Sequence, residues 1–182
     1  MQPVADLIFE ALFLKHVPRS GYAFLGTGRE SVAEHVYAAT FIAFVLSRLE
    51  PTADTQRLVT MCIVHDLPEA RIGDLNYVQK RYVRPDTAQA VTDALQRVDW
   101  GPDIAALIEE FEAGTTLEAK LARDADQLSL VVDLKALKDL GYATPDEWLP
   151  HVRDRLQTRT AKDLADALMA TPRNEWWFRL FC

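Results

Sequence analysis

Apolar residues recur at intervals of three to four along most of the chain, which is the spacing of one helix face. The pattern predicts helices over 3–16, 32–49, 54–66, 86–97, 102–112, 116–140, 145–156 and 160–170. Glycine is scarce, with 7 residues, and no long stretch alternates apolar and polar positions as a half-buried strand does. The chain is therefore predicted to be all-α, a compact helical bundle.

Two of these helices are apolar almost all round, namely 32–49 and the second half of 54–66. Such helices are expected to be buried on most sides. Ser31, followed three residues later by Glu34, predicts a capping box at the start of the first of them. Pro68 cannot continue the second one, so we expect a kink and a short new turn there.

The length of 182 residues suits one domain with a substantial core. We interpret 1–182 as a single domain, with a motif-bearing part at about 14–130 and C-terminal helices over 145–182 that pack on it. An aromatic cluster near the C-terminus, Trp176 to Phe181, is expected to join the core of its own chain. The alternative is that it forms a contact between subunits.

Net charge, cysteine content and apolar run lengths limit the ligands and the cellular location that the sequence predicts. The net charge is −7 with both signs dispersed, which argues against nucleic-acid polymers and anionic membranes but not against a small phosphorylated ligand. Cys62 and Cys182 form no disulfide framework, so a reducing compartment such as the cytoplasm is expected. No stretch reaches ~18 uninterrupted apolar residues, and we therefore expect neither a membrane span nor a signal peptide.

Four polar residues lie where the pattern predicts burial. His65 and Asp66 end the second apolar helix, His35 lies early in the first, and Asp126 lies in the longest helix. Each alone has a structural interpretation, as a hydrogen-bonded core histidine, a helix cap or a solvated residue. Nearby Asp124 is expected to be solvent-exposed. Two histidines and two aspartates converging from three buried helices predict a site for one divalent cation, because buried carboxylates are costly unless paired or metal-bound.

The sequence around these positions resembles a known family. The words "PRSGYAFLG", "ESVAEHVY", "VHDLPEARIGDL" and "RDADQL" are similar to those of the HD-domain phosphohydrolase superfamily. Within it they resemble the small 5′-deoxynucleotidase branch, the HD-domain-containing protein 2 and YfbR-like group. The resemblance covers about residues 14–130. It implies an all-α homodimer that removes the 5′-phosphate from deoxyribonucleoside 5′-monophosphates with the help of a divalent metal ion.

The resemblance also assigns roles. It places the metal ligands at His35, His65, Asp66 and Asp126. Glu69 is implied to handle the attacking water, Asp74 to approach the sugar 3′-hydroxyl, and Arg19 to bind the phosphate. A cation can activate water and neutralise charge on the phosphate, while an arginine gives bidentate contact. Nitrogen and oxygen ligands suit Co, Mn, Mg, Zn or Fe, so the sequence does not identify the metal.

Three positions leave alternatives open. The YfbR-like type has a tryptophan directly after the arginine, whereas Ser20 and Gly21 follow here, so Tyr22 either closes on the sugar or anchors the loop. Lys80 either reaches a phosphate or is a solvated cation. It keeps open a triphosphohydrolase acting on deoxynucleoside triphosphates. Arg71 either binds a carboxylate or phosphate of the ligand or forms a structural salt bridge. A non-catalytic nucleotide-binding or scaffold module is the alternative of another class.

Overall fold

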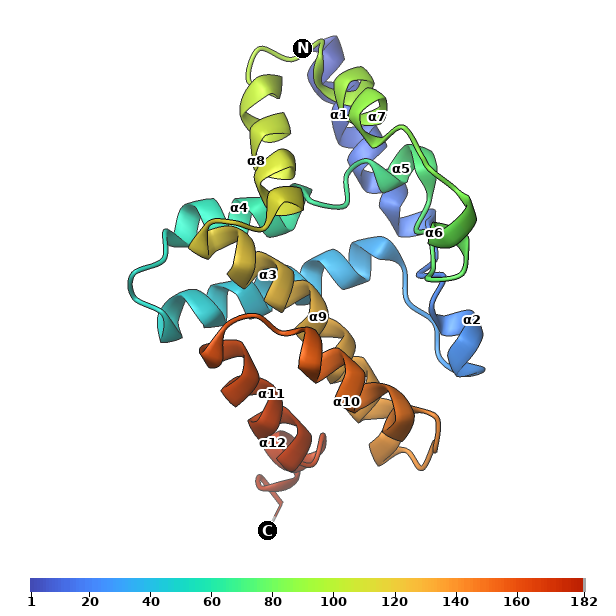
Figure 1. Ribbon diagram of the computed structural model, residues 1–182, viewed down its shortest axis with the longest axis vertical. Helices are drawn as coiled ribbons and strands as arrows, with labels where there is room; N and C mark the ends of the chain where they lie inside the picture. The colour runs from blue at the N-terminus through green and yellow to red at the C-terminus, as the bar shows by residue number, and fades with distance from the viewer. Residues whose placement is uncertain (182) are drawn as a thin grey trace.

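The computed structural model describes residues 1–181, and no β-strand occurs among them, as predicted for an all-α chain (Figure 1). The helices of six residues or more are α1 (Gln2–Phe13), α3 (Val32–Leu49), α4 (Thr55–Val64), α7 (Thr87–Leu95), α8 (Gly101–Ala113), α9 (Leu117–Asp139), α10 (Pro145–Arg155) and α11 (Arg159–Ala170). The short elements are η1 (Leu14–His16), α2 (Tyr22–Leu25), α5 (Glu69–Ile72), α6 (Gln79–Tyr82) and α12 (Glu175–Phe178). Cys182 lies outside the described residues.

The predicted helices are confirmed, and the differences lie at their ends. The first ends at Phe13 and tightens into η1, and the third ends at Val64. The capping box is present: the Glu34 amide donates to Ser31 Oγ at 3.2 Å, and the Ser31 amide donates to the Glu34 carboxylate at 2.7 Å. The predicted turn after Pro68 is α5. The short helices α2 and α6 lie between the predicted helices, where no helix was predicted.

Helix α9 is the centre of the structure and packs against α3, α4, α8, α10 and α11 (Figure 1). Its buried residues Leu121 and Leu128 join Leu46 of α3 with Leu58 and Met61 of α4 in one fully buried cluster. Burial of each such side chain contributes about 1.5–3 kcal/mol. The helices α3, α4 and α9 therefore meet, as the apolar pattern predicted, and each carries a candidate ligand.

The C-terminal helices α10 and α11 both pack on α9. Leu149 and Val152 of α10 pack with Leu134 of α9, and Ala161 and Ala165 of α11 join the main cluster. The aromatic residues that follow do not join a core, and that prediction is wrong. Trp176 and Phe181 are each 78% exposed, and the Trp177 ring contacts the rings of Phe178 and Phe181. The alternative, a contact between subunits, stays a prediction.

Helix α3 has two different faces, which corrects the expectation that it is buried on most sides. Val32, Ala39 and Leu46 are inaccessible to solvent, whereas Tyr37 and Phe41 are 75% and 59% exposed. By length and composition alone, α3 could also span a membrane, with a mean hydropathy of 1.3. Core helices of water-soluble proteins share these properties, and the inner face of α3 packs on α4 and α9.

Candidate active site

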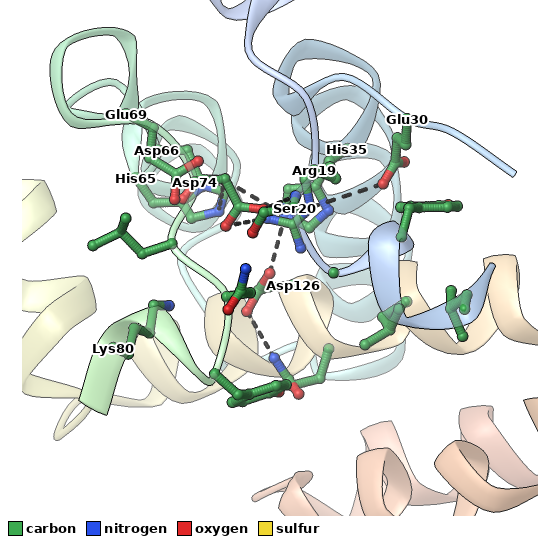
Figure 2. Close-up of a pocket in the computed structure, with 18 of the residues that line it drawn as sticks. Arg19, Ser20, Glu30, His35, His65, Asp66, Glu69, Asp74, Lys80 and Asp126 are labelled. Carbon is green, nitrogen blue, oxygen red and sulfur yellow. Dashed lines mark hydrogen bonds and ion pairs between the residues drawn. The ribbon is translucent and has the colours of Figure 1, made fainter. Parts of the chain in front are cut away.

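Three helices bring the predicted ligands together (Figure 2). His35 lies in the first turns of α3, His65 caps the C-terminus of α4 with Asp66 directly after it, and Asp126 lies on α9. The donor atoms of His35, His65 and Asp126 lie within 4.8 Å of one another. Asp66 Oδ2 lies 3.2 Å from His65 Nε2 and 3.6 Å from His35 Nε2. His35 Nε2 lies 3.0 Å from Asp126 Oδ1.

Backbone and hydroxyl groups fix the orientation of both histidine rings. His65 Nδ1 donates to the Cys62 carbonyl at 2.9 Å. Ser129 Oγ donates its only proton to the Asp126 carbonyl at 2.8 Å, so it accepts a hydrogen bond from His35 Nδ1 at 2.9 Å. Both rings therefore present Nε2 to the cluster, which is the arrangement of metal-binding histidines oriented by a second hydrogen bond. Ser129 was not predicted, although it follows Asp126 by one helical turn.

Two properties of the cluster suit a bound cation: the chemical type of its ligand atoms, and the buried atoms that lack hydrogen-bond partners. His35 Nε2, His65 Nε2 and Asp66 Oδ2 are buried and have no hydrogen-bond partner. Buried polar atoms without partners cost free energy, and a divalent cation bound to two nitrogens and to carboxylate oxygens would remove that cost. These residues are therefore suited to hold one divalent ion.

Electrostatic coupling inside the cluster is strong. Burial lowers the pKa of His65, but the Asp66 and Asp126 carboxylates outweigh it and raise that pKa to about 9. Burial raises the pKa of Asp126, but the His35 ring, 3.0 Å away, together with His65 and Arg19, outweighs burial and holds the pKa below its usual range. Burial also raises the pKa of Asp66, but the neighbouring His65 and His35 rings lower that pKa below its usual value. The site thus keeps ionised carboxylates where positive charge is present, as cation binding requires.

Glu69 begins α5, close to the cluster but outside the group of donors that lie within 4.8 Å (Figure 2). Burial raises the pKa of Glu69 to about 9, and the neighbouring Asp66 and Asp74 carboxylates act in the same direction. Its Oε2 is buried without a partner. Glu69 is thus a carboxyl group with a free oxygen beside the candidate cation site, which is the property needed to hold or accept a proton.

Arg19 reaches the same site from the loop between η1 and α3. Its guanidinium lies 3.8 Å from Asp74 Oδ1 and 3.9 Å from Glu30 Oε2. Asp74 Oδ2 in turn accepts hydrogen bonds from the Ser20 amide at 2.7 Å and from the Ser20 hydroxyl at 3.3 Å. Asp74 therefore fastens the loop that carries Arg19, while its predicted contact with a sugar hydroxyl stays a prediction.

Tyr22 serves as an anchor of this loop, and its ring also lines the cavity. Its hydroxyl donates to Asp133 Oδ2 at 2.7 Å. Burial and this acceptor both raise the pKa of Tyr22 above its ordinary range. Gly28, with a φ of 76°, lets the ring lie close, because a Cβ there would come within 2.9 Å of Tyr22 Cε1. The hydroxyl is thus engaged with Asp133, and a contact between the ring and a sugar stays a prediction.

One cavity unites these groups. Its lining includes the predicted residues His35, His65, Asp66, Glu69, Asp126, Arg19, Asp74, Lys80 and Tyr22, and also Glu30 and Glu112. Apolar side chains from α8, α9 and α10, namely Phe111, Leu130 and Trp148, complete its wall. All nine predicted site residues therefore lie around a single cavity. A concave, partly apolar site with convergent polar groups is typical of small-molecule binding.

Two other charged residues have structural partners. Asp124, expected to be exposed, is instead buried, because it accepts hydrogen bonds from the Gln157 and Thr158 amides and from the Thr158 hydroxyl, joining α9 to the start of α11. Arg71 pairs with Glu10 of α1, with Nη2 2.8 Å from Oε2, and does not line the cavity. The structural alternative therefore describes Arg71.

The fold and the site together define an all-helical protein with a buried histidine–aspartate cluster beside a carboxyl group and an arginine. The chain belongs to the HD domain family, whose sequence profile matches residues 12–168. It is 28% identical over 135 residues to a human protein named 5′-deoxynucleotidase HDDC2, a match covering 71% of this chain and 65% of the human protein. A fission-yeast relative, 5′-deoxynucleotidase hdd1, is 24% identical over 131 residues, 66% of this chain and 65% of its own length.

Solved structures agree on the fold. A conserved hypothetical protein from Pyrococcus furiosus superposes with a TM-score of 0.76 at 27% identity, covering 92% of this chain and 99% of that protein. A cyanophage HD phosphohydrolase, described as bound to dA and one catalytic Zn²⁺ ion, superposes with a TM-score of 0.57 at 20% identity, covering 88% of this chain and 92% of its own. At that identity the likeness concerns the fold alone.

Proposed function

We propose that this protein is a metal-dependent phosphohydrolase that removes the 5′-phosphate from deoxyribonucleoside 5′-monophosphates. The observation that carries the proposal is the single cavity in which the His–Asp cluster, Glu69 and Arg19 face one another. The printed names of the curated relatives support the substrate class, although the matched segment spans 65% of the length of the human protein.

His35, His65, Asp66 and Asp126 would hold one divalent ion, chosen from Mn, Co, Fe, Zn or Mg by supply as much as by ligand type. When bound, such an ion supplies Lewis acidity and neutralises phosphate charge. The protein's own groups bind, orient and transfer protons around it. This division of work suits a phosphomonoester, whose uncatalysed hydrolysis is extremely slow.

Arg19 binds phosphate oxygens, because its guanidinium faces the cavity and its loop is fastened by Asp74. Glu69, in its ionised form, would receive a proton from the attacking water. A cation bound beside it would favour that form by lowering the Glu69 pKa from about 9, and the buried Oε2 without a partner supports this role. Asp74 and the Tyr22 ring contact the deoxyribose, and Lys80 adds a cation at the cavity wall. The buried polar atoms of the cluster that lack hydrogen-bond partners favour this enzyme over a non-catalytic module.

We propose in addition a homodimer located in the cytoplasm. Tyr37, Phe41 and Phe44 form one exposed face of α3, with the two phenylalanine rings 6.5 Å apart, and a second copy would cover them. Sedimentation analysis of the wild type and of Phe41→Glu tests this directly. A wild-type dimer that becomes a monomer in the variant is expected, and a monomeric wild type would contradict it.

The activity is tested by incubating the protein with Mn²⁺ or Co²⁺ and either dAMP, AMP or dATP. Phosphate release from dAMP, abolished in His65→Ala, is the expected result. Release of tripolyphosphate from dATP would instead support the triphosphohydrolase alternative. Absence of turnover with every substrate, in a protein that carries its metal, would contradict the proposed activity.

A further inference from the structure

A second cavity adjoins the first and shares part of its wall. The residues common to both are Tyr77, Lys80, Phe111, Glu112, Asp126 and Gln127. The second cavity adds Arg123, Arg155 and Gln157, which do not line the first. We call this second cavity the cationic annex, because its wall includes Lys80, Arg123 and Arg155.

The three cations come from three elements, α6, α9 and α10. Within residues 1–181 none of them forms an ion pair with a carboxylate, in contrast to Arg57, Arg71 or Arg153. The annex also contains Glu112 and Asp126, but Asp126 belongs to the candidate cation site. Unpaired positive charge is thus concentrated beside the active site of a chain whose net charge is −7.

All three cations are exposed, and the Tyr77 ring holds Arg155 in place. The Arg155 guanidinium lies 4.7 Å from the centre of the Tyr77 ring and donates to the Tyr77 hydroxyl. Arg123 lies against the backbone of Gly114, where any Cβ would overlap its guanidinium. Lys80 projects from α6 apart from the His–Asp cluster (Figure 2). Ordered guanidinium groups lose less conformational entropy on binding an anion than free ones.

Gln127 lines both cavities. Its Nε2 donates to Asp126 Oδ2 at 2.9 Å, while its Oε1 is buried and has no donor. A ligand that occupies both cavities could donate a hydrogen bond to this oxygen from a hydroxyl or amino group. The lining of the annex therefore includes a hydrogen-bond acceptor without a donor, Gln127 Oε1, in addition to its three cations.

We propose that the cationic annex binds a second phosphate group of the substrate, with Arg123 and Arg155 as its ligands. The proposal rests on the proposed function, since it takes the first phosphate to lie at the His–Asp cluster. Arginine pairs with phosphate through two parallel hydrogen bonds, which explains why two guanidinium groups are placed there. The second phosphate is either a 3′-phosphate of the nucleotide, which keeps the proposed removal of a single 5′-phosphate, or a further phosphate of a 5′-polyphosphate, which would make the triphosphohydrolase alternative the activity.

The test compares kcat/KM for dAMP with that for deoxyadenosine 3′,5′-bisphosphate, dADP and dATP, using protein loaded with Mn²⁺. We expect the wild type to prefer a compound with a second phosphate. Arg123→Ala and Arg155→Ala should each reduce kcat/KM for that compound, relative to kcat/KM for dAMP, by about tenfold. This is the scale of one contact of about 1.4 kcal/mol. Arg48→Ala, which removes an exposed arginine at the end of α3 outside both cavities, is the matched control.

The compound whose kcat/KM falls most in the annex variants identifies the source of the second phosphate. The proposal would be overturned if, in both annex variants, the ratio of kcat/KM for each compound to kcat/KM for dAMP were the same as in the wild type. An equal fall of kcat/KM for all substrates, as expected if the annex holds the base, is one such result. If the wild type hydrolyses none of the compounds, the proposed function fails and titration calorimetry decides the annex. Binding of the bisphosphate about tenfold tighter than dAMP, lost in both variants, would support the annex, and equal binding would refute it.

Discussion

His35 on α3 and Ser129 on α9 are joined by a hydrogen bond of 2.9 Å between Nδ1 and Oγ. Ser129 also donates to the carbonyl of Asp126, the candidate ligand one turn earlier. One hydroxyl therefore couples the orientation of a histidine on one helix to the position of an aspartate on another. Both residues are about 1% exposed, so water cannot replace this link.

Replacement of Ser129 should weaken metal binding without removing a ligand. Loss of such a partner typically lowers metal affinity by ~10–100-fold, and Ser129→Ala should also reduce stability by about 1 kcal/mol. Isothermal titration of the metal-free protein with Mn²⁺ and thermal melting measure the two effects. Ser47→Ala is the matched control, because Ser47 is buried but bonds only to the Phe44 carbonyl of its own helix. Equal metal affinity in both variants would show that Ser129 does not orient the ring.

Glu69→Gln separates chemistry from binding. The variant keeps the size and the hydrogen-bonding capacity of the side chain but cannot accept a proton from water. The value of kcat should fall by ~10²–10⁴, the usual range for losing a general base. KM and metal content should change little, because the lost interaction acts in the transition state. A kcat near that of the wild type, with bound metal and normal melting, would exclude Glu69 from the proton transfer.

Arg19→Ala should raise KM for dAMP by at least ~10-fold, the scale of one charge-assisted contact of about 1.5–3 kcal/mol. Arg29→Ala, in the same loop, is the matched control, since Arg29 is exposed and does not line the cavity. Steady-state kinetics at saturating metal measure the effect. If the two variants have the same KM, Arg19 supports the loop and does not bind the phosphate.

Glu30 provides a prediction for pH-dependent stability. Burial raises its pKa to about 8, Asp133 adds to the shift, and Arg19 opposes it. Between its ordinary pKa near 4.5 and 8 the unfolded chain ionises this group while the folded chain keeps the proton, so wild-type stability falls as pH rises. Glu30→Gln cannot titrate. The melting temperature of the variant minus that of the wild type should therefore rise from pH 5 to pH 8 and stay constant above.

Thermal melts of both proteins at pH 5, 6.5, 8 and 9 measure this difference. Glu34→Gln is a suitable comparison because the pKa of Glu34 is shifted downward by its hydrogen bonds with Ser31. That variant should show no corresponding rise between pH 5 and 8. A difference that is independent of pH for Glu30→Gln would mean that Glu30 is ionised throughout this range.

The sequence predicted most of the helices and the residues around the cavity, because both depend on local signals. Apolar spacing located α3, α4 and α9, and family-like words marked His65 and Glu69 beside Pro68. Contacts between distant segments were not predictable in the same way. Asp124 reads as a polar helix residue, yet it is buried because Gln157 and Thr158 happen to present three donors to it.

Other features depend on what each helix packs against. The pattern of α3 is apolar all round, and no local signal distinguishes Ala39 on its buried face from Phe41 on its exposed face. The cationic annex joins Arg123 to Arg155, from different helices, and only tertiary packing brings them to one cavity. Ser129 could have been found from its position one turn after Asp126, but its partner His35 could not.

The central claim is that two histidines and two aspartates bind one divalent ion. The most direct measurement is the metal content, determined by elemental analysis, of the wild type and of Asp126→Ala after dialysis from excess Mn²⁺. Asp103→Ala, which removes an exposed aspartate from the first turn of α8, is the matched control, and circular dichroism verifies that all three proteins are folded. One ion per chain in the wild type and the control, and none in Asp126→Ala, is the predicted result. A folded wild type that retains no ion, or an Asp126→Ala variant that retains a full one, would contradict the claim.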